Sequence, residues 1–187
     1  MAPDQKKARR LGATIIFVDE VGFSFLAPLG PTWAPVARTP CLRRLSKRRE
    51  QSTIVGLTAT GRVFKLHYSH PIRGEQVVPF LRHLRRRLCG PLIVVWDRAS
   101  IHRAQFVQEF LAAHPEIHIE LLPPYAPDLN PEEYCHGHVK QQLRNYTPAT
   151  VQELHSVVER GFTRVRRRPT LLLSFFHHAG LSLNRFM

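Results

Sequence analysis

An unbroken apolar run, LIVVW at residues 92–96, places the strongest constraint on how this chain can fold. A strand that is apolar at every position must be covered on both faces, as in parallel sheets flanked by helices. A second run, TIIFV at residues 14–18, is rich in the β-branched residues that favour strands. Asp97 follows the first run, and Asp19 and Glu20 follow the second. The two runs predict neighbouring strands in one layered sheet.

Strands and helices alternate along the rest of the chain. Residues 52–60 and 62–68 are expected to form a hairpin around Gly61, and residues 117–122 another strand. Apolar residues recur at helical spacing in four further segments, residues 77–88, 106–111, 135–146 and 151–165. This order predicts a mixed α/β domain built on βαβ crossovers. Ligands of such sheets gather beyond the carboxyl ends of strands, where we expect Asp19 and Asp97.

Length and charge limit the class of protein. The 187 residues suit one folded domain, which we place at residues 13–187 after a basic tail at residues 1–12. The net charge of +13 favours a polyanionic partner such as nucleic acid, although an acidic protein or ribosomal RNA would also suit it. No apolar segment has the length of a membrane helix, and three distant cysteines fit a reduced, cytoplasmic protein.

A proline-rich stretch, LPPYAPDLNPEEY at residues 122–134, leads into the third predicted helix. Asn130 suits the N-cap and Pro131 the first helical position. Glu133 then falls where a capping box would use it, yet four prolines stiffen this approach more than a cap requires. Such rigidity would suit a metal ligand. Glu132 competes for that role, but it lies about 100° round the helix, so both cannot point at one site.

Three carboxylates, Asp19, Asp97 and Glu133, would together form a hard oxygen site. Mg²⁺ or Mn²⁺ suits such a site, and two ions can act together on a phosphodiester. With a basic surface, this predicts a metal-dependent nuclease or phosphoryl transferase that acts on nucleic acid.

Four segments carry a resemblance to a known family. They are FVDEVGF (residues 17–23), TWAP (32–35), VVWDRASIH (94–102) and LPPYAPDLNPEE (122–133). In this order and spacing they resemble the DDE transposases of the mariner-like superfamily, and the bacterial insertion-sequence branch in particular. The proline-rich block is the most specific of the four.

The resemblance implies an RNase H-like fold, with a five-stranded mixed sheet between helices. It implies that Asp19, Asp97 and Glu133 are the catalytic acids and the ligands of Mg²⁺ or Mn²⁺. It also implies cut-and-paste transposition, in which the element end is cleaved and joined to target DNA. The implied partners are double-stranded DNA (element ends and target) and a second copy of the chain on that DNA, in the nucleoid of a bacterial cell.

This chain departs from the family pattern at several places. Arg98 stands where the family has Asn, Glu132 where it often has a small hydrophobic residue, and Val36 and Ala37 follow TWAP in place of a basic residue and Gly. The family's helix-turn-helix modules have no counterpart before residue 14. We therefore expect the catalytic part of a split transposase, served by a separate helix-turn-helix polypeptide, or a truncated remnant.

Weaker candidates are side chains that would contact nucleic acid: Trp33, Arg98, His102 and Lys140. For Trp33 a packing role, and for His102 a surface position, are equally compatible. The segment Cys135–His138 matches no standard zinc spacing, and Cys135 falls on the apolar helical face. Two other functions stay open, another RNase H-like nuclease such as an integrase and a catalytically inactive DNA-binding remnant.

Overall fold

A five-stranded mixed sheet forms the centre of the computed structural model, which describes residues 5–26, 28–42 and 50–181. The strands are β1 (Thr14–Ser24), β2 (Glu50–Thr58), β3 (Val63–Tyr68), β4 (Leu92–Trp96) and β5 (Ile117–Leu121), in the order β3-β2-β1-β4-β5. β2 is antiparallel to β1 and β3, whereas β4 lies parallel to β1 and β5. The sheet has the strand arrangement expected of an RNase H-like domain, so the predicted fold class is confirmed.

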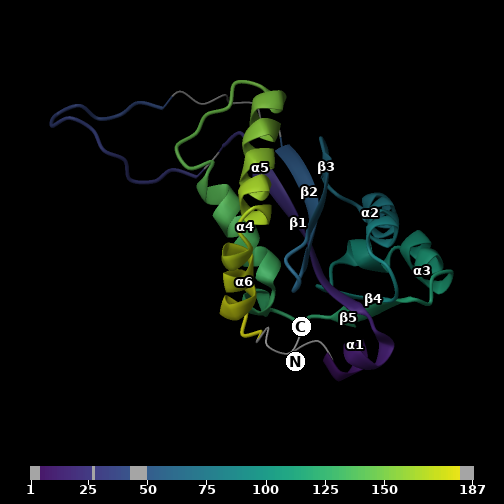
Figure 1. Cartoon of the computed structure of the whole chain (residues 1–187). Coiled ribbons are helices and arrows are strands. Elements are labelled where there is room, and N and C mark those ends of the chain that lie inside the picture. The colour runs from purple at the N-terminus through teal and green to yellow at the C-terminus, as the bar shows by residue number, and fades with distance from the viewer. Residues whose placement is uncertain (1–4, 27, 43–49, 182–187) are drawn as a thin grey trace.

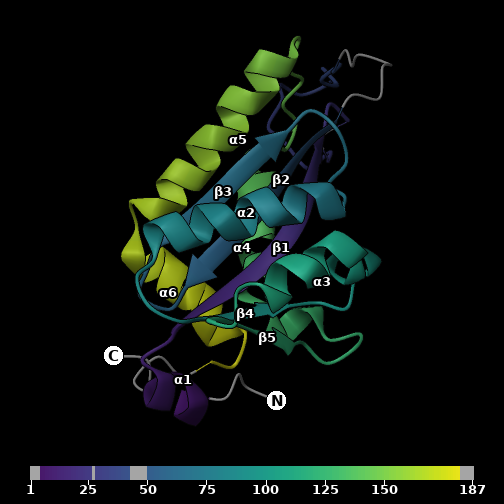
Figure 2. The same ribbon diagram turned by 90° about the vertical axis from the view of Figure 1, so that its right-hand side faces the viewer.

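Helices cover both faces of this sheet (Figures 1 and 2). α2 (Gly74–Arg87) and α3 (Gln105–Ala112) lie on one face. α4 (Pro131–Gln141), α5 (Val151–Arg166) and α6 (Pro169–His178) lie on the other. The short helix α1 (Gln5–Leu11) occupies the segment expected as a tail, and α6 was not anticipated from the sequence. No helix within the described ranges is long and apolar enough to cross a membrane.

Side chains of β1 alternate between two buried cores. Ile16 and Val18 pack towards α2 and α3, whereas Phe17 and Val21 pack towards α4, α5 and α6. The Phe17 ring meets Phe176 of α6 edge-on, with 5.6 Å between the centroids. Because successive side chains of a strand point to opposite faces, this alternation directs residue 19 to the α4 side and residue 20 to the α2 side.

The position of Asp19 on its strand corrects the sequence prediction. β1 continues to Ser24, so Asp19 lies within the strand and pairs with Val55 of β2. The antiparallel pairing with β2 sustains β1 after its parallel pairing with β4 has stopped at Phe17 and Val95. If the register between β1 and β4 continued for two more residues, Asp19 would lie opposite Asp97. The two acids therefore meet where β4 ends, as expected, although β1 itself does not end there.

Candidate metal centre

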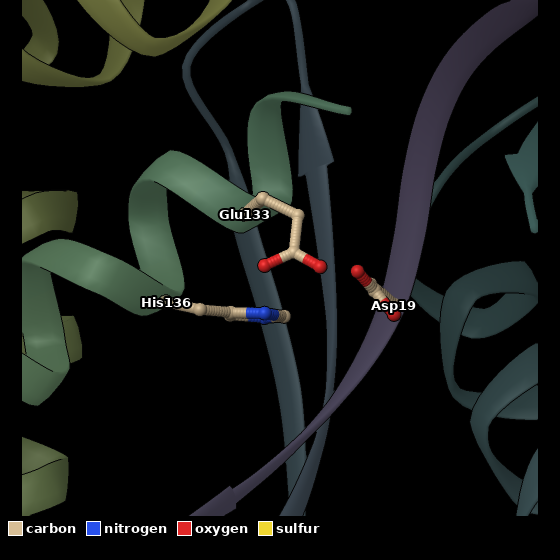
Figure 3. A group of neighbouring side chains, drawn as sticks. All are labelled: Asp19, Glu133 and His136. Atoms are coloured by element: carbon tan, nitrogen blue, oxygen red, sulfur yellow. The ribbon is translucent and has the colours of Figure 1, made fainter. Parts of the chain in front are cut away.

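The three predicted acids line one cleft on the α4 side of the sheet. Its volume is about 460 Å³, and Asp19, Asp97 and Glu133 all contribute to its wall. Ligand atoms of Asp19, Glu133 and His136 lie within 4.8 Å of one another, and Figure 3 shows the Glu133 carboxylate facing Asp19. The rest of the wall consists of Arg98, Asn130 and residues 122–127. The proline-rich loop thus forms part of the cleft.

Asn130 connects the start of α4 to Asp19. Its Oδ1 accepts a hydrogen bond from the Glu132 amide at 3.2 Å, as an N-cap should, and its Nδ2 donates to Asp19 Oδ2 at 2.9 Å. The Asn130 backbone amide donates to the Pro127 carbonyl at 2.8 Å, so it does not close a capping box with Glu133. The Glu133 side chain is left to face the cleft. The sequence predicted Asn130 as the N-cap, but it did not predict the hydrogen bond from Asn130 to Asp19.

Removing this connection gives a first prediction. Asn130→Ala is expected to destabilise the protein by about 1–2 kcal/mol, the usual range for a lost N-cap, and to weaken Mn²⁺ binding several-fold because Asp19 loses its anchor. Urea unfolding and Mn²⁺ titration measure the two effects. Thr150→Ala removes the equivalent cap of α5, where Thr150 Oγ1 accepts from the Glu153 amide at 3.1 Å. That control should lose stability alone, and equal Mn²⁺ affinity in both variants would refute the anchoring role.

The charges in the cleft repel one another. Burial raises the pKa of Asp19 to about 8, and repulsion from Glu20, Glu133 and Asp97 adds to this effect. A divalent cation between such carboxylates would reverse the repulsion and favour their ionised forms. The donors present are mainly carboxylate oxygens, the ligands that Mg²⁺ and Mn²⁺ prefer. The residues of this cleft therefore fit the implied metal.

His102 lies in the interior between two acids, although the sequence suggested a contact with nucleic acid or a surface position. Its side chain is 3% exposed and stacks on Trp96 at 4.2 Å between ring centroids. Nε2 lies 3.2 Å from Glu20 Oε1, and Nδ1 lies 3.2 Å from Asp97 Oδ1. Burial alone would lower the pKa of His102, but the hydrogen bonds to Asp97 and Glu20 outweigh it and raise the pKa to about 9. His102 thus holds Asp97 from behind, and its ring is buried and not at the surface.

The two glutamates at the start of α4 point in different directions, as their offset on the helix requires. Glu133 is exposed at the cleft, whereas Glu132 is 0% exposed and points into the protein. Neither carboxylate oxygen of Glu132 makes a well-formed hydrogen bond with the described residues. Burial, and then the charge of Asp19, raises the pKa of Glu132 well above its usual value. Glu132 therefore lies buried beneath the cleft, where its ionised form is disfavoured.

The remaining candidates lie at different distances from this centre. Arg98 is exposed on the cleft wall, and its Nε donates to the Leu122 carbonyl at 3.4 Å. Lys140 is exposed on α4. Burial lowers the pKa of His136, and the positive charge of Lys140 adds to this effect. Trp33 is fully exposed in the segment 28–42, which extends away from the sheet in Figure 1. The structure places Arg98 at the site, and Trp33 outside the residues that line the cleft.

A protein-family model described as "DDE superfamily endonuclease" matches residues 14–155, which include all three acids. The chain belongs to the DDE superfamily endonucleases. Curated proteins provide no match to the sequence. The matched residues of this DDE endonuclease chain begin with β1 and extend into α5.

Solved structures of Mos1 mariner transposase share the fold of this DDE endonuclease. The catalytic domain of Mos1 aligns with a TM-score of 0.54 and 16% identity, over 95% of this chain and 89% of that one. The Mos1 paired-end complex with Mn aligns with a TM-score of 0.66 and 16% identity, over 92% of this chain and 57% of that one. The chain spans between 57% and 60% of the length of the Mos1 transposase chains in such complexes.

Proposed function

We propose that this DDE endonuclease chain is the catalytic part of a cut-and-paste DNA transposase of the bacterial insertion-sequence type. The observation that carries the proposal is the convergence of Asp19, Asp97 and Glu133 on one cleft of a protein with a net charge of +13. Mos1 structures of the same fold include a paired-end complex with a transposon end and a strand transfer complex. By analogy, the substrates here are the ends of a mobile element and a target DNA duplex.

Asp19, Asp97 and Glu133 would hold Mg²⁺ or Mn²⁺, the ions present in two Mos1 paired-end complexes. Two such ions, when bound, activate the attacking oxygen and neutralise the leaving oxygen of a phosphodiester. The chain's own residues position these ligands, because Asn130 holds Asp19 and His102 holds Asp97. Cleavage by water would leave a 3′-hydroxyl at the element end. Attack of that oxygen on a target phosphate would form the new phosphodiester bond, break the target strand there and release its 3′-hydroxyl. A second copy of the chain and a separate helix-turn-helix polypeptide would bring the ends together.

Arg98 is proposed to hold a DNA phosphate at the cleft. Arg98→Ala should lower DNA affinity about three- to tenfold at low salt and reduce the slope of log affinity against log salt by about one. Fluorescence anisotropy with a labelled duplex measures both quantities. Arg86→Ala is the matched control, because Arg86 is exposed on α2 across the sheet. Equal losses in both variants would show that Arg98 contributes only general charge.

The test of the proposed function is cleavage of supercoiled plasmid by the whole chain in Mn²⁺ or Mg²⁺, followed by joining of element ends to target DNA. Metal-dependent nicking with strand transfer supports the transposase. Metal-dependent nicking without strand transfer, even with a helix-turn-helix module fused from an upstream reading frame, would favour another RNase H-like nuclease. DNA binding without cleavage under all these conditions would favour an inactive remnant.

A further inference from the structure

His136 is a buried imidazole whose role is explained neither by packing in the fold nor by the three acids of the cleft. It lies on α4, its side chain is 3% exposed, and its Nε2 makes no well-formed hydrogen bond with the described residues. In Figure 3 its ring extends from α4 towards β1, below the Glu133 carboxylate and beside Asp19. A buried polar group without a well-formed hydrogen bond is costly, so a stronger partner for this imidazole would stabilise it.

We propose that His136 is a ligand of the metal ion held by Asp19 and Glu133, which gives this centre a nitrogen donor beside its carboxylates. The inference rests on the proposed metal site and adds to it. Ligand atoms on one ion, with bonds of about 2.0–2.2 Å, lie at most about 4.4 Å apart. The three residues offer atoms within 4.8 Å of one another, which is close to this limit, so side-chain rotations would bring all three onto one ion.

The local sequence explains how α4 supplies two of these ligands. Glu133 and His136 are three residues apart, and residues at this spacing share a helix face. A Glu-x-x-His pair serves as a two-ligand unit in helical metal proteins. The neighbours of His136 have other positions, since Cys135 lies in the apolar core and the His138 ring lies 6.0 Å from Phe175. The Cys-x-x-His segment therefore contributes one candidate ligand and no separate zinc site.

A competing explanation is that His136 serves only Glu132. Its Nε2 lies 3.5 Å from Glu132 Oε2, one helical turn away, which is at the limit of a hydrogen bond. That contact would hold the ring whether or not a metal binds. The two explanations make different predictions about metal preference. If His136 is a ligand, its removal changes which metal the site prefers, and if it serves only Glu132, the preference stays the same.

A nitrogen ligand should shift the preference of the site. Imidazole adds affinity for transition metals such as Mn²⁺ and Co²⁺, whereas Mg²⁺ gains little from replacing an oxygen by a nitrogen. We therefore expect His136→Gln to weaken Mn²⁺ binding about tenfold and Mg²⁺ binding less than about twofold. The control His138→Asn should bind both ions like the wild type.

The experiment uses the whole chain with Mn²⁺ as the probe. Mn²⁺ affinity is measured by titration in an EPR spectrometer, Mg²⁺ affinity by competition, and the folding of each variant by circular dichroism. Electron spin-echo modulation of bound Mn²⁺ in the wild type detects a coordinated ¹⁴N nucleus, so the test does not depend on the His136 variant folding. Asp19→Asn identifies the part of the Mn²⁺ signal that comes from the proposed centre.

Three outcomes distinguish the claims. Modulation from ¹⁴N that Asp19→Asn removes, together with a selective loss of Mn²⁺ affinity in a folded His136→Gln, supports the proposal. Mn²⁺ binding that depends on Asp19 but shows no ¹⁴N coupling overturns the role of His136 and leaves the proposed function intact. Mn²⁺ binding that does not depend on Asp19 overturns both.

Discussion

Glu133→Gln is expected to reduce Mn²⁺-dependent nicking of supercoiled DNA by at least about 10³-fold, whereas Glu132→Gln is expected to stay within about threefold of wild type. Glu133 faces Asp19 across the cleft, and an amide in its place cannot supply the negative charge that a metal ion requires. Glu132 is buried, and burial raises its pKa well above the usual value, so its ionised form is disfavoured and the uncharged amide of glutamine is a conservative replacement. Initial nicking rates at several Mn²⁺ concentrations measure the difference.

This pair of variants is a stringent comparison because the two residues are adjacent and the chemical change is the same. Asp19→Asn and Asp97→Asn should be as inactive as Glu133→Gln. If Glu132→Gln were inactive while Glu133→Gln cleaved normally, the third acid would be assigned to the wrong residue. If all four variants nicked DNA like the wild type, the activity would come from a different site or from a contaminant.

The second large effect concerns pH and the contacts of buried His102 with Glu20 and Asp97. The folded-state pKa of about 9 lies above the ordinary value of 6.5, so protonated His102 stabilises the folded state. That contribution is fully present below about pH 6.5 and is lost as the pH rises through about 9. The shift corresponds to about 3 kcal/mol at most, and we expect about 2 kcal/mol because solvent reaches Asp97. His102→Gln, which cannot be protonated, should lack this loss.

Urea unfolding gives the free energy of unfolding of the wild type and of His102→Gln at each pH between pH 6 and pH 9.5. The difference between the two free energies at each pH measures the contribution of His102. Other groups, including Asp19, titrate in both proteins, and their effects largely cancel in the difference. His177→Gln, on the exposed end of α6, is the matched control and should follow the wild type. A constant difference between wild type and His102→Gln across this range would show that His102 is not charged in the folded protein.

Local patterns in the sequence were sufficient to predict most strands of the sheet and to place Asp19, Asp97 and Glu133 around one cleft. The run at residues 92–96 is buried at every position, as its composition predicted. The end of β1 was predicted wrongly because Asp19 and Glu20 interrupt the apolar run, yet pairing with β2 carries the strand on to Ser24. Propensity cannot reveal such pairing, since it depends on a partner strand that is distant along the chain, as Val55 is from Asp19.

The surroundings of the acids could not be predicted in the same way. His102 and His136 both resemble ordinary surface histidines in the sequence, and each is buried against a carboxylate supplied by tertiary packing or by the preceding helical turn. Alternation along β1 could have indicated that Glu20 faces away from Asp19 and towards the segment that follows β4. The second hydrogen bond of Asn130 had no comparable signal, because it depends on how α4 lies across the sheet.

The most direct measurement of the central claim is the anomalous scattering of Mn²⁺ in a crystal of the whole chain, collected near the manganese absorption edge. Anomalous peaks are expected in the cleft between Asp19, Asp97 and Glu133, with His136 bound to the ion that Asp19 and Glu133 share. A crystal saturated with Mn²⁺ that shows no peak at these carboxylates, while ions bind elsewhere, would contradict the metal centre and the function proposed from it.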